Sequence, residues 1–111
     1  MKVEPRHVVG FEHAGKVRCA VVLVVQAGGN KARVVYGTSK GGREHWPQVI
    51  VRARSRNATA LGLTVDTFFY DRAIRIADVL TELSPWSRTG GGRDLPPLRC
   101  PPALFLELRK L

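Results

Sequence analysis

Three short stretches of the sequence place cationic and hydroxyl-bearing side chains close to glycine or to the end of an expected strand. They are residues 12–18 (EHAGKVR), residues 37–45 (GTSKGGREH) and residues 52–56 (RARSR). Glycine lets a backbone approach a ligand closely, and hydroxyl, ammonium and guanidinium groups donate hydrogen bonds to phosphate oxygens. These residue types therefore suit phosphate binding. A solvated polar turn is the alternative for the second stretch, which lacks the spacing of a nucleotide-binding P-loop.

Arg18 stands out among these residues because it directly precedes the continuous apolar run CAVVLVV, residues 19–25. Such a run is typical of a buried strand. A guanidinium held at the start of a rigid strand can bind two phosphate oxygens at once, which a lysine cannot imitate. The alternative role for Arg18 is a surface ion pair with Glu12, worth at most about 1 kcal/mol.

The elements that must position these residues are short strands. The pattern predicts a buried strand over residues 18–25, a turn at Gly29 and Asn30, and a second strand from about Arg33 to Tyr36, together forming a hairpin. A third strand is expected within residues 46–55, with Val49 and Val51 on its apolar face. Residues 57–63 are expected to form a turn or one helical coil.

The second half of the chain is harder to assign. Residues 64–83 fit a strand, a bend and a second strand to about Ala77, followed by a short helical turn; a helix over residues 72–83 is the alternative. Residues 85–102 are rich in glycine and proline and predict a flexible loop, and a short helix is expected after Pro102. The whole pattern predicts a mostly β fold in one domain, residues 1–111: a small SH3-like antiparallel barrel with a short C-terminal helix.

Composition narrows the choice of partners. The chain has 111 residues and a formal net charge of +9, which favours a polyanion such as a nucleic acid or an acidic protein. It has no apolar run of the roughly 20 residues that a membrane span needs, and no signal-peptide pattern. Cys19 and Cys100 fit no metal-ligand spacing, so no metal or cofactor is expected, and reduced thiols in the cytoplasm are expected.

The aromatic and histidine side chains leave two alternatives open. Trp46 and Trp86 could stack on bases, although tryptophan more often packs in a core or at its edge. The three histidines, His7, His13 and His45, are scattered and are interpreted as surface or turn residues.

Four segments resemble the MazF/PemK-type toxins of type II toxin–antitoxin systems. Residues 12–25 resemble the family's N-terminal signature, in which an acidic residue and a glycine-containing loop precede Arg-Pro and an apolar run. Residues 34–40 (VVYGTSK) resemble its second signature, and residues 60–69 and 101–111 are similar to later segments. The chain departs from the family at Cys19, where proline is common, in a longer loop before Arg18, and in a shortened opening strand.

The resemblance implies an SH3-like barrel that forms a homodimer, cleaves single-stranded RNA without a metal and is neutralised by an antitoxin protein. It implies that Arg18 and Thr38 are catalytic. Glu12 matches the family's acidic loop residue and is expected to be the third catalytic residue, which either accepts the 2′-hydroxyl proton or positions Arg18. The cations and hydroxyl groups at the strand ends are then expected to bind RNA: Lys16, Ser39, Lys40, Arg43, Arg52 and Arg54. The alternatives are a noncatalytic basic barrel that binds nucleic acid or an acidic protein, and an adaptor module.

Overall fold

The computed structural model describes residues 2–86 and 97–111 and is built on one antiparallel sheet of six strands, in the order β4-β5-β3-β2-β1-β6. The strands are β1 (Val8–His13), β2 (Lys16–Val25), β3 (Lys31–Thr38), β4 (Gln48–Val51), β5 (Thr67–Asp78) and β6 (Leu83–Pro85). Two short helices accompany them, α1 (Arg56–Ala60) and α2 (Pro102–Arg109). The mostly β fold with a short C-terminal helix is thus confirmed.

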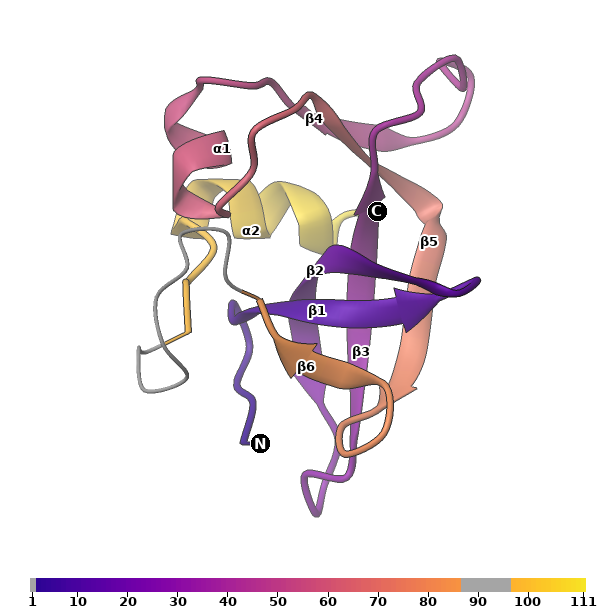
Figure 1. Cartoon of the computed structure of the whole chain (residues 1–111), viewed down its shortest axis with the longest axis vertical. Helices are drawn as coiled ribbons and strands as arrows, with labels where there is room; N and C mark the ends of the chain where they lie inside the picture. Colours follow the sequence, from indigo (N-terminus) through magenta and orange to yellow (C-terminus); the bar gives the residue numbers. More distant parts are fainter. Residues whose placement is uncertain (1, 87–96) are drawn as a thin grey trace.

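The sheet is curled, so that β1 and β6 run across the direction of β3 (Figure 1). The hydrogen-bonded ladder of the described residues starts at β4 and ends at β6. Closure of this sheet into an SH3-like barrel therefore stays a prediction.

Residues 19–23 of β2 are buried on both faces of the sheet, which explains most of the continuous apolar run. Cys19, Val21 and Leu23 belong to a cluster with residues of α1 and α2, while Ala20 and Val22 belong to a second cluster with residues of β1 and β3. The predicted hairpin of β2 and β3 is confirmed by their antiparallel pairing. Arg18 thus directly precedes the part of β2 that packing holds from both sides.

Strand β5 carries the largest irregularity of the sheet. Along β3, Val35 pairs with Ile74 and Gly37 pairs with Phe69. The four residues 70–73 of β5 therefore stand opposite the single residue Tyr36, so β5 has three extra residues at this point. The predicted bend is therefore a bulge within one continuous strand, and the helix considered for residues 72–83 is wrong. Gly37 is required here, because a Cβ atom would clash with Cγ2 of Thr67 and lie 3.1 Å from the Phe69 ring.

The helices follow the local signals. Ser55 caps α1, with its hydroxyl accepting a hydrogen bond from the backbone N–H of Ala58 at 3.1 Å. Helix α2 begins at Pro102 and buries Leu104, Phe105 and Leu108. Both expected helical segments are confirmed, and within the described part of the chain no helix is long and apolar enough to cross a membrane.

The predicted loop over residues 85–102 has regular structure at both ends. Pro85 ends β6, which pairs with β1. At the other end, the backbone N–H of Val8 donates to Leu98 O at 2.9 Å, and that of Cys100 donates to Arg6 O at 2.7 Å. These bonds tie the segment before α2 to the start of β1. The predicted flexibility of residues 87–96 lies outside the described residues.

Candidate functional site

A cavity of about 290 Å³ opens where the β1–β2 turn, the end of β3, the loop after β3 and the bulge of β5 meet. Two of the three sequence stretches that suit phosphate binding contribute to it. Its cationic lining residues are Arg18, Lys40, Arg43 and Arg72, and Thr38 adds a hydroxyl. None of the described lining residues is acidic. The cavity is therefore suited to an anion.

Arg18 lies half-buried at this cavity, with Cζ 5.9 Å from the centre of the Tyr36 ring. Its Nε is buried and has no hydrogen-bond partner among the described residues. A buried donor without a partner costs free energy, and such groups are rare outside functional sites. Arg18 forms no ion pair with Glu12 in the structure, so the surface ion pair considered for it is not made.

Tyr36 is the centre of the first aromatic group in the cavity. The imidazole of His13 stacks on it, with ring centres 4.7 Å apart and an angle of 28° between the planes. Phe11 lies next to it at 5.7 Å, and Cζ of Arg75 lies 5.7 Å from the Tyr36 ring centre. These contacts fix the positions of His13 and Arg18 relative to each other.

Trp46 is the centre of the second aromatic group. Cζ of Arg72 lies 4.7 Å and Cζ of Arg43 lies 5.4 Å from its ring, while Tyr70 meets it edge-on at 5.4 Å. Two guanidinium groups thus already contact the indole that was considered for base stacking. Trp86 is half-buried against the cluster of α1 and α2, and its Nε1–H donates to Leu61 O at 3.1 Å, which fits the structural role.

The loop after β3 is fixed at two points beside Thr38. The Thr38 hydroxyl oxygen accepts a hydrogen bond from the backbone N–H of Lys40 at 3.2 Å, and the Tyr70 hydroxyl donates to Lys40 O at 3.2 Å. Gly41 lies against Phe68, where a Cβ atom would come within 2.9 Å of the ring. The loop therefore holds Lys40 and Thr38 together at the edge of the cavity.

Glu12 lies on the opposite face of the sheet from Arg18. In the β1–β2 ladder Glu12 pairs with Val17 and Phe11 pairs with Arg18, and successive side chains of a strand alternate between faces. Glu12 is exposed and does not line the cavity. Its predicted catalytic role stays a prediction that this geometry does not support.

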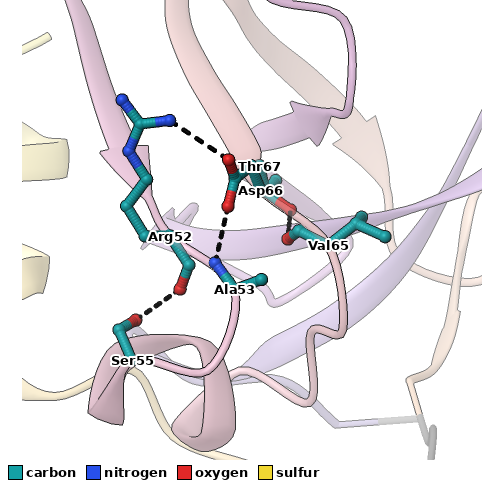
Figure 2. Close-up of polar contacts among 6 residues, drawn as sticks. All are labelled: Arg52, Ala53, Ser55, Val65, Asp66 and Thr67. Carbon is teal, nitrogen blue, oxygen red and sulfur yellow. Dashed lines mark hydrogen bonds and ion pairs between the residues drawn. The ribbon is translucent and has the colours of Figure 1, made fainter.

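Four of the six residues predicted to bind RNA, Lys16, Ser39, Arg52 and Arg54, also do not line the cavity. Arg52 is engaged elsewhere: its Nη1 lies 3.1 Å from Asp66 Oδ2 (Figure 2). The same carboxylate accepts the backbone N–H of Ala53 at 2.8 Å, and the Ser55 hydroxyl donates to Arg52 O at 2.6 Å. The third stretch, residues 52–56, thus forms a bonded corner between β4 and α1, and its role in RNA binding stays a prediction.

The structure adds residues that sequence reasoning missed. His13, Tyr70 and Arg72 line the cavity, the last two because the β5 bulge presents them. Asp71, between them, has a buried Oδ1 without a hydrogen-bond partner among the described residues. His7 is buried rather than at the surface. The sequence around Tyr70 and Arg72 carried no signal for these two positions, because a bulge cannot be placed from one strand alone.

The two cysteines do not line the cavity. Among residues 2–86 and 97–111, no three His, Cys, Asp or Glu side chains gather as a metal site would need. Cys19 and Cys100 are buried in the core, and burial raises the pKa of the Cys100 thiol to about 12. Cys100 is therefore protonated, and a poor nucleophile, at neutral pH.

The sequence matches no known protein-family model and no curated protein. The likeness to MazF/PemK-type toxins therefore rests on the four sequence segments alone.

Proposed function

We propose that this protein is a metal-independent endoribonuclease that acts in the cytoplasm as a toxin and cleaves single-stranded RNA at the cavity. The observation that carries the proposal is the meeting of Arg18 and Thr38 in one cavity with Lys40, Arg43 and Arg72, without a lining carboxylate. Of the three residues predicted to be catalytic, Arg18 and Thr38 belong to this group, whereas Glu12 does not.

The proposed reaction is attack of the RNA 2′-hydroxyl on the adjacent phosphate. DNA lacks this nucleophile, so it would bind without being cut. Negative charge grows on the phosphate oxygens during the attack, and preorganised donors stabilise it. Arg18 supplies a planar pair of donors directly before the part of β2 that is buried on both faces, and Thr38 orients the phosphate with its hydroxyl.

The test is incubation of purified protein with a single-stranded oligoribonucleotide in EDTA. Products ending in a 2′,3′-cyclic phosphate and a 5′-hydroxyl support the proposal. Intact RNA with a gel shift that weakens in salt supports the alternative of a noncatalytic nucleic-acid-binding protein. Neither cleavage nor a shift supports the adaptor module, or a protein that binds an acidic partner.

We also propose that the protein is a homodimer and that an antitoxin protein neutralises it. Exposed apolar side chains support a protein interface: Val24 is 50% and Ile76 is 47% exposed, and both pair with Arg33 in the sheet. A small chain gains stability by covering such side chains. Sedimentation at tens of micromolar protein tests the dimer, and a monomer at that concentration would contradict it.

A further inference from the structure

The proposed cleavage needs a proton acceptor for the 2′-hydroxyl, and the cavity itself limits the choice. Glu12 is on the other face of the sheet from Arg18. The described lining side chains that ionise are guanidinium, ammonium, phenol and imidazole groups. Of these only an imidazole accepts a proton near neutral pH. The lining residue of this type is His13.

His13 is placed as a base would have to be. It is the last residue of β1, half-buried, and its ring is held against Tyr36, the ring that Arg18 also contacts. Thr38 follows Tyr36 by two positions on β3, so both point to the same face of the sheet. The His13 nitrogens make no hydrogen bond or ion pair among the described residues, so a substrate hydroxyl does not compete with a protein donor for them.

The charges around His13 come from every neighbouring element. The cavity contributes Arg18 from β2, Lys40 and Arg43 from the loop after β3, and Arg72 from β5. Lys16 is the register partner of His13, and Arg75 reaches the same Tyr36 ring. The phenols of Tyr36 and Tyr70 are the other ionisable groups of the lining. These cations surround the place where a substrate phosphate would lie, next to the His13 ring.

We propose, building on the RNA-cleavage proposal, that His13 is the general base of the reaction. A ring nitrogen of His13 takes the 2′-hydroxyl proton as the 2′-oxygen forms its bond to phosphorus. The bond from phosphorus to the 5′-oxygen of the next nucleotide then breaks, and that oxygen takes a proton from water. The products are a 2′,3′-cyclic phosphate and a 5′-hydroxyl, and His13 returns its proton to the hydroxide that the water left.

The inference is tested by single-turnover cleavage of one oligoribonucleotide across a pH series, using wild type, His13→Gln and the matched control His45→Gln. A general base contributes roughly 10² to 10⁴ in rate, so His13→Gln is expected to be at least about 100-fold slower at neutral pH. The His13→Gln variant is also expected to lose the increase of cleavage rate with rising pH that a general base produces. His45 is exposed in the loop and does not line the cavity, so its variant keeps the wild-type profile.

A second readout separates catalysis from a structural role of the stacked ring. His13→Ala leaves space beside Tyr36, and added imidazole is expected to restore cleavage in a concentration-dependent way, with thermal melts showing that the variant is folded. If the wild type cleaves RNA and the His13→Gln variant has the same cleavage rate and the same pH profile, this inference is overturned and the proposed function stands. A Glu12→Gln variant that flattens the profile while His13→Gln does not overturns it as well. A wild type that leaves RNA intact overturns the proposed function, and this inference with it.

Discussion

The arginines of the cavity and the arginines elsewhere on the molecule are held in different ways. Arg18, Arg43 and Arg72 each lie against an aromatic ring and form no ion pair within the described part of the chain. Arg52 and Arg99 each pair with a carboxylate, Asp66 at 3.1 Å and Glu4 at 3.2 Å. An aromatic face orients a guanidinium without using its N–H groups. The cavity arginines therefore keep donors for a ligand, while the other two already use theirs within the protein.

The paired arginines belong to local structure. Asp66 accepts the backbone N–H of Ala53 and then the Arg52 guanidinium, and these two bonds lower the pKa of its carboxyl group. Arg99 and Glu4 lie where the segment before α2 joins the start of β1. The two groups of arginines carry the same charge. They differ in what they contact, which is an aromatic ring in one group and a carboxylate in the other.

Among the substitutions that test this comparison between arginines, the largest effect is expected at Arg18. Arg18→Lys keeps the charge but removes the planar pair of donors, and the loss of one such donor costs about 10² to 10³ in rate. We expect cleavage to fall by this factor while RNA affinity, which depends on many cations, changes little. Single-turnover kinetics and a binding titration at matched salt measure both.

The matched control is Arg52→Lys, which changes a paired arginine in the same way. It should cleave RNA like the wild type. If Arg18→Lys and Arg52→Lys lose the same amount of cleavage activity, the contrast between ring-contacting and carboxylate-paired arginines does not bear on function.

Thr38→Ala should have a smaller effect. It removes one neutral hydroxyl, and a hydrogen bond of this kind contributes about 0.5 to 1.5 kcal/mol, or roughly 2- to 13-fold in rate. The fold should persist, because Thr38 is only half-buried at the end of β3. Thr59→Ala, which removes an exposed hydroxyl on α1, is the control. Full activity of Thr38→Ala would mean that the Thr38 hydroxyl takes no part in cleavage and that the cationic side chains of the cavity act without it.

We expect stability to depend on pH through His7, which lies beside the ion pair of Arg99 and Glu4. Burial lowers the pKa of His7 from its ordinary value of 6.5, Arg99 lowers it further, and Glu4 partly opposes this. The unfolded chain thus binds the proton more readily than the folded one. Stability from this group is present above about pH 6.5 and is lost as pH falls toward the lowered value. Urea unfolding at pH 7.5 and pH 5.5 checks it: His7→Gln should weaken the difference, and an unchanged difference would exclude His7 as its source.

The smallest effect is expected from Asp66→Asn. The variant loses the ion pair with Arg52 and weakens the bond to Ala53 N, so the corner before α1 should unfold slightly more easily. Because the corner lies outside the cavity, its cleavage rate should stay at the wild-type value. Thermal melts and the cleavage assay together decide this, and a large loss of cleavage would extend the active region to residues 52–66.

Much of the fold could be predicted from local patterns. Residues 19–23, directly after Arg18, are buried on both faces, and the glycine-rich turn before Lys31 joins two strands as expected. Pro102 starts the last helix. Strand β6 was not predicted, because its three residues carry no periodicity and are defined by pairing with β1.

The site could be predicted only in part. Arg18, Thr38, Lys40 and Arg43 lie at ends of predictable strands, and the curled sheet brings them together. Tyr70 and Arg72 depend on where β5 shifts its register against β3, which no single strand determines. The sequence predicts that Glu12 acts beside Arg18 in catalysis, but the register of the hairpin places the two side chains on opposite faces of the sheet.

The most direct test of the central claim, that the cavity arginines bind the RNA phosphate, is a chemical-shift titration of the labelled protein with an oligonucleotide that has 2′-deoxy sugars and so cannot be cleaved. The account predicts that the largest amide and guanidinium shifts fall on Arg18, Thr38, Lys40, Arg43 and Arg72, and that Arg52 and Asp66 hardly change. Shifts concentrated at residues 52–66, or spread evenly over all exposed cations, would contradict it.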